Sequence, residues 1–494
     1  MAYPEWVEKN RLQGCEVKCI SGKYYLYKLK SRWDSSKGKA VKISGEYLGA
    51  ITEAGFIPKR VSTPISAIYV VKEYGASAYL MSISEDIHKA LANSFETRTA
   101  ESIYVAAILR VMGESSFKRM EDSYQTSYIS EIIPNLSLSG QAITALLEYI
   151  GRRRDRITEV MRDLSCCAMN IIVDGTRMTS FSKEMMFPAV GYSSGADWDP
   201  KVNIMYVFER AELPQPVFYR CVQGNIPDVT AMKLTIEAME REAEVTVVAD
   251  TGFADVTNYA LLSQYGMKYI IPLKRNSAEL TIAELGNRAN FSTAFTYNTR
   301  PVTSYQLERE DYKILVFRDE EMRYHEMSDF ITRLEKKNQS IHESKNKSNE
   351  EEIDIGLETL KADPRFGVII MRTNTEFSPK EVYETYKMRE AIEQCFDTLK
   401  NTLSQDHSYM HSDASFEAWC FINHIALILA YRILNIIKQA GLTSTYSLRD
   451  IMVYLSRIQK IKIGPIWKTA EYTSKAQKVC DKLGFKIDYG NIIS

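Results

Sequence analysis

Four side chains suited to binding metal or phosphate lie between residues 386 and 400, in the segment YKMREAIEQCFDTLK. On a helix turning about 100° per residue, Tyr386, Arg389, Glu393 and Lys400 fall within an arc of about 60°. The carboxylate suits a metal ion, whereas the guanidinium, the ammonium and the phenol suit phosphate oxygens. This face therefore predicts a site that cuts polynucleotides.

The same segment has an apolar side on a neighbouring arc. It contains no proline or glycine, so a continuous helix is expected. We expect the apolar arc to pack against a core while the face with the four polar side chains stays free. The apolar residues are Met388, Ile392, Cys395, Phe396 and Leu399.

Two aspartates elsewhere in the chain could complete a metal site with Glu393. Asp174 follows the apolar run 170–173, and Asp250 follows the run 245–249, so each is expected where a buried strand ends. Alone, each aspartate is more simply a turn or helix-capping residue, and Glu393 alone is more simply an exposed helix residue. Their joint order favours two Mg²⁺ or Mn²⁺ ions, with Asp174 bridging both and the other two acids each holding one.

The elements around these aspartates predict an α/β core. Apolar and amphipathic patterns predict strands at 170–173, 201–209, 217–223, 245–249 and 268–273, with helices at 228–242 and 254–264. Three strands, a helix and a strand is the order found in ribonuclease H-like folds. The motif GNIPD at 224–228 predicts a turn that ends at a helix cap rather than a substrate contact.

After this core, the pattern changes to short β-like stretches at 294–297, 305–308 and 313–317, then to the charge-rich segment 333–354. This predicts a β-rich insertion at about 276–365, before the last catalytic helix. Lys274 and Arg275 follow the fifth strand and are expected to bind phosphate. The catalytic domain is expected to span 161–440, followed by a C-terminal helical region at 441–494.

Residues 1–160 predict an α+β N-terminal DNA-binding region. Two aromatic or β-branched stretches around a turn predict a β-hairpin at 22–49, and helical periodicity at 78–150 predicts a small bundle. The first sixty residues carry 12 Lys or Arg against 6 acids, a net +6, although the chain as a whole has a net charge of -1. The run Arg152, Arg153, Arg154 and Arg156 is equally a solvated helix face or a phosphate contact.

Composition excludes several classes of protein. With 494 residues and 45% hydrophobic content, the chain can form two or three globular regions and is not disordered. Its start lacks the apolar run of a signal peptide, which favours the cytoplasm. Cys15 and Cys19 have no second Cys or His pair at zinc-finger spacing, so no structural zinc is expected. The apolar stretch 416–437 contains Glu417 and Arg432, which favours a buried core helix over a membrane span.

Taken together, these motifs resemble those of the DDE transposases of bacterial and archaeal insertion sequences, in the group with a Tyr-Arg-Glu-Lys signature. The resemblance rests on Asp174 in VDGT, Asp250 in ADTGF, and the signature Tyr386, Arg389, Glu393 and Lys400, and covers about 170–431. It implies a two-metal active site, DNA phosphates gripped by the three signature residues other than Glu393, and a homodimer that pairs two transposon ends. Members often have Trp directly after the signature arginine, whereas this chain has Glu390.

The resemblance implies an enzyme that binds the terminal inverted repeats of its own element, cleaves double-stranded DNA and joins the freed ends to target DNA. Water attacks first, and the resulting 3′-hydroxyl attacks afterwards. Two other hypotheses stay open. One is a non-mobile nuclease with the same ribonuclease H-like fold, and the other is a domesticated transposase-derived protein that binds DNA without cutting it.

Overall fold

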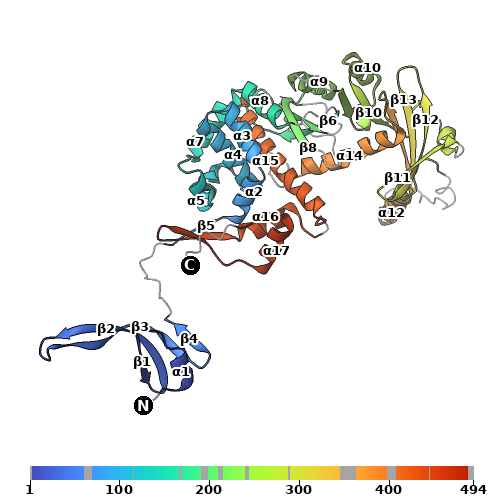
Figure 1. The fold of residues 1–494 in the computed structure, drawn as a ribbon. Coiled ribbons are helices and arrows are strands. Elements are labelled where there is room, and N and C mark those ends of the chain that lie inside the picture. The colour runs from blue at the N-terminus through green and yellow to red at the C-terminus, as the bar shows by residue number, and fades with distance from the viewer. Residues whose placement is uncertain are drawn as a thin grey trace. The chain divides into compact units, whose positions relative to one another are not determined.

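The protein consists of two compact units, seen in a computed structural model (Figure 1). One unit comprises Met1–Val70 with Lys462–Ile466, and the other comprises Val71–Ile461 with Trp467–Ser494. The expected N-terminal region 1–160 is thus divided between the two units, because its helices belong to the larger one. The structure describes residues 3–59, 69–114, 116–165, 170–190, 199–209, 215–239, 244–287, 290–344, 363–397, 408–443 and 445–487.

The smaller unit is an antiparallel sheet in the order β1-β2-β3-β4, with a short helix α1 at its start. Its elements are α1 Glu5–Lys9, β1 Cys15–Ile20, β2 Lys23–Asp34, β3 Lys39–Thr52 and β4 Gly55–Pro58. The hairpin expected at 22–49 is confirmed as β2 and β3. A separate small core of this unit contains Val7, Cys15, Val17, Leu26 and Ile51.

The larger unit begins with helices that surround the long helix α15, Asp413–Gln439. An 18-residue window of α15 is apolar enough to cross a membrane, but 78% of that window is buried inside the protein. The expectation of a core helix is therefore confirmed. The surrounding elements are α2 Gly75–Ser82, α3 Glu85–Ser94, α4 Thr97–Val111, η1 Phe117–Arg119, α5 Met120–Thr126, α6 Ile129–Ile132, α7 Gly140–Gly151 and α8 Arg154–Leu164.

A nine-stranded mixed sheet forms the centre of the larger unit, in the order β11-β12-β13-β14-β10-β9-β6-β7-β8. β6 pairs in parallel with β9 and β9 with β10, whereas β6, β7 and β8 pair antiparallel. This arrangement confirms a mixed α/β fold. The elements are β6 Asn170–Thr179, β7 Lys201–Glu209, β8 Gln215–Gln223, α9 Asp228–Met239, β9 Glu244–Val248, η2 Thr251–Phe253, α10 Val256–Gln264 and β10 Lys268–Leu273.

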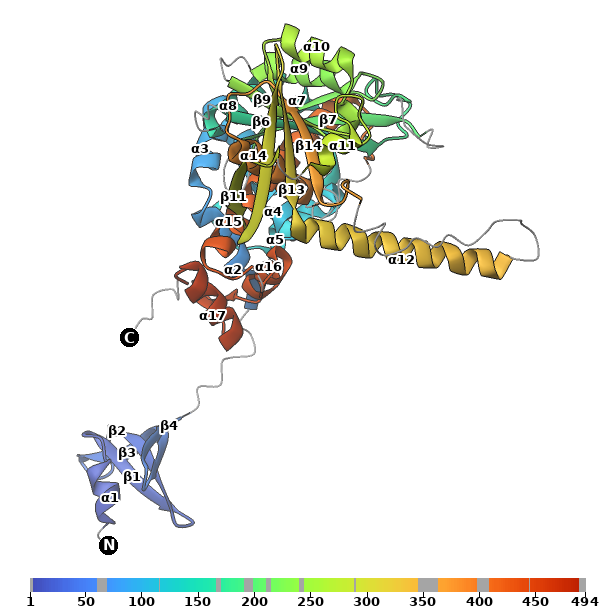
Figure 2. The same cartoon turned by 90° about the vertical axis from the view of Figure 1, so that its right-hand side faces the viewer.

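The strands expected in the insertion join this same sheet. β13 pairs antiparallel with β14, which in turn pairs with β10, so the insertion widens the sheet instead of forming a separate layer. Part of the charge-rich segment is the helix α12, which extends from the sheet as an arm (Figure 2). The elements are α11 Ile282–Gly286, β11 Thr293–Tyr297, β12 Arg300–Glu308, β13 Lys313–Asp319, α12 Glu320–Ser344 and β14 Val368–Thr373.

After β14 come the helix with the signature residues and a C-terminal part of mixed structure. The part from 441 onward was expected to be helical, but it also contains the strands β15 and β16, which pair with each other, and β15 also pairs with β5. The sequence QKIKIGPIWKT alternates around a glycine turn, which is a hairpin pattern that the helical expectation overlooked. The elements are α14 Pro379–Asp397, α16 Leu448–Ser456, β15 Gln459–Ile463, β16 Ile466–Thr469, α17 Ser474–Leu483 and, earlier in the chain, β5 Tyr69–Glu73.

Candidate active site

Three carboxylates from distant parts of the sequence converge on the guanidinium of Arg389. Its Nη2 lies 3.3 Å from Glu393 Oε1 and 3.9 Å from Asp250 Oδ2, and its Nε lies 3.7 Å from Asp174 Oδ2. These distances are those of ion pairs, and two of them are longer than a hydrogen bond. Since one cation faces three anions, negative charge remains in excess when all four groups are ionised.

The sheet brings the two aspartates to the same edge. β6 and β9 are parallel neighbours in which Ile171 pairs with Val245, so both strands carry their aspartate toward the same end. Asp250 directly follows β9, as expected. Asp174 was expected at the end of a strand, which is wrong, because β6 continues to Thr179 through its antiparallel pairing with β7.

Packing of α14 explains why Arg389 points toward the carboxylates. Val382, Thr385 and Ile392 are fully buried, and their spacing of three and seven residues places them on one side of the helix. Arg389 lies four residues after Thr385 and three before Ile392, so it belongs to this inward side. Glu393 lies next to it at the margin, where 57% of its side chain is exposed. The side of α14 that carries Arg389 and Glu393 is therefore continuous with the side that packs against the core.

Electrostatic strain is concentrated at Asp174. Burial raises the pKa of this carboxyl from 3.8 to about 6, even though the Gly175 N–H and the charge of Arg389 lower it. The nearby charges of Asp250 and Glu393 contribute smaller increases. The Gly175 N–H donates to Asp174 Oδ1 at 2.8 Å. A carboxyl with a raised pKa binds a proton more readily. The same excess of acids favours the binding of other positive charge beside Asp174.

A cavity of about 630 Å³ contains the three carboxylates and is lined elsewhere by polar residues that the sequence motifs did not reveal. Arg177 Nη2 pairs with Asp228 Oδ2 at 3.3 Å, and Lys201 lines the same wall. Asn203 is 2% exposed and donates to the Ile226 carbonyl, whereas its Oδ1 has no hydrogen-bond partner among the described residues.

The register of β6 and β7 brings this polar wall together. Arg177 pairs directly with Asn203, and Thr179 pairs with Lys201. The only sequence signal was the position of Arg177, three residues after Asp174. Asp228 was expected as a helix cap, and it begins α9 while its carboxylate faces the cavity.

The family described as Transposase DDE domain matches residues 167–429, which is more than half of the chain. The chain belongs to this family of DDE transposases. A cryo-EM structure of the piggyBac transposase synaptic complex with hairpin DNA is similar at 10% identity over 81% of each chain, with a TM-score of 0.39. No curated protein matches the sequence.

The other residues expected to contact DNA occupy varied positions in this DDE transposase. Tyr386 is half-buried and packs against the main core, and Lys274 is exposed after β10. Arg275 donates to both carboxylate oxygens of Glu326, at 3.0 and 2.6 Å, and to the Val368 carbonyl, so its guanidinium binds within the protein. Lys400 lies outside the described residues. Glu390 lies in α14, and its side chain is outside the description.

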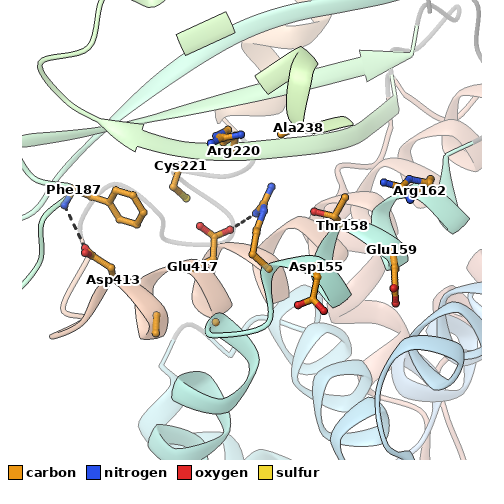
Figure 3. A pocket seen from close by; sticks show the side chains of 13 residues that line it. Asp155, Thr158, Glu159, Arg162, Phe187, Arg220, Cys221, Ala238, Asp413 and Glu417 are labelled. Atoms are coloured by element: carbon orange, nitrogen blue, oxygen red, sulfur yellow. Dashed lines mark hydrogen bonds and ion pairs between the residues drawn. The ribbon is translucent and has the colours of Figure 1, made fainter. Parts of the chain in front are cut away.

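A second cavity of about 630 Å³ lies where α8, β8 and the start of α15 meet, with Glu417 and Arg220 pointing into it (Figure 3). Arg154 at its wall donates to Glu417 and, at 2.5 Å, to the Tyr219 carbonyl. The guanidinium of this member of the arginine run is thus bound within the protein, while 31% of the side chain remains exposed. It joins the helical part of the transposase to the sheet.

Members of this family generally use divalent metal ions. Across the described ranges, no group of three or more His, Cys, Asp or Glu side chains lies close enough together to hold an ion. The donor set nevertheless fits a hard dication, because three carboxylates already surround one cationic group. The guanidinium of Arg389 lies within 4 Å of all three carboxylates.

Proposed function

We propose that this transposase binds the terminal inverted repeats of its own insertion sequence, cuts the DNA at their ends and joins those ends to target DNA. The observation that carries the proposal is the convergence of Asp174, Asp250 and Glu393 on one cation. By itself, a cleft with excess negative charge repels a polyanion such as DNA. Divalent ions would remove this repulsion by binding the carboxylates and the phosphate together.

We assign the catalytic domain to the ribonuclease H-like fold. The support is the strand order β8-β7-β6-β9-β10, with the first three strands antiparallel and the last two parallel to β6. In this arrangement β6, which comes first in the sequence among these five strands, lies at the centre. Its carboxylate therefore has neighbours on both sides, which suits a residue that bridges two ions.

Asp174, Asp250 and Glu393 are the proposed ligands of two Mg²⁺ or Mn²⁺ ions. Bound there, the ions would supply an activated oxygen nucleophile and stabilise the departing oxygen during in-line displacement at phosphorus. Asp174 must release its proton to act as a ligand, because a metal-binding carboxylate is ionised. Arg389 offsets part of the negative charge of the acids in the free protein and, once displaced from them, would offer its planar guanidinium to a DNA phosphate.

The DNA contacts proposed outside the ligands come from Tyr386, Arg389, Lys400, Lys274 and Arg275. Among the last pair, Lys274 is the better candidate, since Arg275 already binds Glu326 and Val368. Residues 1–160 are proposed to recognise the transposon ends, and two copies of the chain to pair them. We also propose that the chain is a member of the group of insertion-sequence transposases with the Tyr-Arg-Glu-Lys signature.

The central test replaces Glu393 with glutamine and measures Mg²⁺-dependent cleavage of duplex DNA that carries the element's own ends. We expect cleavage to fall at least about 1,000-fold, equivalent to losing about 4 kcal/mol of transition-state stabilisation, while end binding persists. Glu384→Gln is the matched control, because Glu384 is on the same helix and pairs with Lys380. Equal cleavage by the Glu393 variant and the control would refute the assignment.

A plasmid excision assay separates transposition from the other hypotheses. A donor plasmid with the element's ends should lose the intervening DNA and yield insertions elsewhere when the wild-type chain is expressed. Cleavage without insertion would identify a non-mobile nuclease. Binding without cleavage would identify a DNA-binding protein derived from a transposase.

A further inference from the structure

The hairpin of the smaller unit extends beyond the sheet to which it belongs. β1 pairs with β2 only as far as Lys28, and β4 pairs with β3 only from Gly49 onward. Apart from the Leu29 N–H, which donates to the Gly14 carbonyl at 3.1 Å, residues 29–34 of β2 and 39–44 of β3 therefore pair only with each other. Figure 1 shows this part of β2 and β3 as an arm of two strands, which we call the ribbon.

The ribbon is cationic and exposes apolar side chains to solvent. Between residues 29 and 44 it carries one acid, Asp34, and five cations. Asp34 is already bound within the turn, where Oδ1 accepts from the Ser36 N–H at 3.0 Å. Trp33 is 67% exposed and Ile43 is 41% exposed, which is unusual for side chains of this size. The cations are Lys30, Arg32, Lys37, Lys39 and Lys42.

The cations lie on both faces of the ribbon. Directly paired residues point to the same side of an antiparallel ladder. One face thus carries Lys30, Arg32 and Lys39 together with Asp34, and the opposite face carries the pairs Ser31–Lys42 and Trp33–Ala40. A flat anionic surface such as a membrane would contact one face only. A groove with a phosphate backbone along each wall matches positive charge on both.

The dimensions favour the major groove of duplex DNA. That groove is about 12 Å wide and admits a two-stranded β-ribbon, whereas the major groove of duplex RNA is deep and narrow. A two-stranded ribbon without a core is also marginally stable in water, so a partner that binds both faces would order it. Trp33, on the face that also carries Lys42, provides an apolar contact for thymine methyl groups.

We propose that the ribbon is a second DNA-binding site, which inserts into the major groove of duplex DNA outside the carboxylate cleft. The proposal rests on the proposed function, in which the chain acts on DNA. It adds the element that makes the contact and the groove that receives it. The cations bind the two backbones, and Trp33 contacts base edges.

The test measures binding of the full-length protein to a fluorescein-labelled duplex carrying the element's terminal repeat, in EDTA to prevent cleavage. The ribbon variant replaces Lys30, Arg32, Lys39 and Lys42 with glutamine. The matched control loses the same charge from exposed positions of the same unit outside the ribbon, namely Lys9, Arg11, Lys23 and Lys59. Circular dichroism of both variants checks that the sheet still forms.

We expect the ribbon variant to bind at least about tenfold more weakly, and its dependence of log affinity on log salt to become shallower by about 3 to 4. The control should change affinity much less. Trp33→Ala should weaken binding and leave the salt dependence unchanged, because it removes contact area and no charge. Equal affinities of the ribbon variant and the control would overturn the proposal.

Two further readouts identify the partner and the groove. Dimethyl sulfate should methylate guanine N7 in the major groove less when the wild-type protein is bound, and the ribbon variant should lose this protection. Protection of adenine N3 alone, in the minor groove, would overturn the proposal. A larger loss of binding to duplex RNA or to vesicles of acidic phospholipid than to DNA would also overturn it.

Failure of this proposal is distinguishable from failure of the proposed function. If the wild-type protein cleaves DNA in a Glu393-dependent way while the ribbon variant binds like the control, only the ribbon assignment falls. If the ribbon is needed for binding but no cleavage occurs with Mg²⁺ or Mn²⁺, the catalytic assignment falls and the ribbon site stands. At saturating protein, the ribbon variant should still cleave.

Discussion

Arg389 has two roles that follow from where its side chain lies. Its helical position alone predicted that it shares a face with Glu393, whereas the structure places its guanidinium among all three carboxylates. A cation held by three acids lowers their mutual repulsion. On the proposed function, the same cation would compete with a metal for those acids.

This competition predicts the effect of Arg389→Gln. Because the substitution removes a positive charge within 4 Å of the three carboxylates, we expect the DNA-free protein to bind Mg²⁺ about tenfold more tightly, while DNA cleavage falls. Isothermal titration calorimetry measures the affinity. Arg177→Gln is the control, since Arg177 lines the same cavity but pairs with Asp228. Weaker Mg²⁺ binding by the Arg389 variant would show that its guanidinium does not oppose the ion.

The raised pKa of Asp174, about 6, predicts how stability depends on pH. An acid whose pKa is higher in the folded state than in the unfolded state stabilises the fold only while protonated. The free energy of unfolding of the metal-free protein should therefore fall as pH rises from about 4 to about 6. Asp174→Asn should reduce this fall. Urea denaturation in EDTA at several pH values measures it, and an identical pH profile for both proteins would contradict the expectation.

At the scale of elements, close backbone contacts fix how the helices support the sheet. Gly151 ends α7 where the start of α15 passes, and a Cβ at this glycine would lie 1.7 Å from the Ala414 carbonyl oxygen. Only a residue without a side chain allows this approach. The next helix, α8, begins with Arg154, which donates to Glu417 of α15.

Gly151→Ala should consequently separate α7 from α15. We expect a loss of about 2 kcal/mol or more in the free energy of unfolding, because backbone atoms cannot yield as a flexible side chain can. Gly140→Ala is the matched control at the other end of α7, where nothing lies within 4 Å of the added Cβ, and it should be neutral or stabilising by about 0.5 kcal/mol. Thermal unfolding followed by circular dichroism measures both. Equal melting temperatures would contradict the close approach.

Many elements were predictable because they depend on local pattern. The strands at 201–209 and 268–273 have the expected bounds. The helix expected at 228–242 is found as α9 over Asp228–Met239, and residues 240–242 lie outside the described residues. The strand expected at 170–173 is shorter than β6, because the sequence Asp174, Gly175 and Thr176 is typical of a turn. Pairing with β7 keeps them extended, and Gly175 leaves room for Met205.

At the scale of the whole molecule, the two units have separate cores. The five buried residues of the smaller core belong to the first sixty residues, and the larger core is formed by the helices and the central sheet. Burying five apolar side chains provides a small margin of stability. The smaller unit should therefore be the more sensitive of the two to a core substitution.

Leu26→Ala should unfold the smaller unit alone. Leu26 is fully buried, and its truncation typically costs about 3 kcal/mol in a well-packed core. We expect weaker binding of duplex DNA, because the ribbon is lost, while the main thermal transition is unchanged. Leu91→Ala, a fully buried leucine of the larger core, should instead lower the main transition. Scanning calorimetry distinguishes them, and a shift of the main transition by Leu26→Ala would argue against separate cores.

The sequence by itself determined the acids and their order, because an apolar run followed by Asp250, or a helical spacing around Glu393, is a local property of the chain. Tertiary structure alone decided that Arg389 lies among the acids, that Arg177 and Asn203 line the same cavity, and that the strands from 293 to 319 widen the central sheet. The physical reason is that strand register and helix packing join segments far apart in sequence. Neither is encoded in the pattern of one segment.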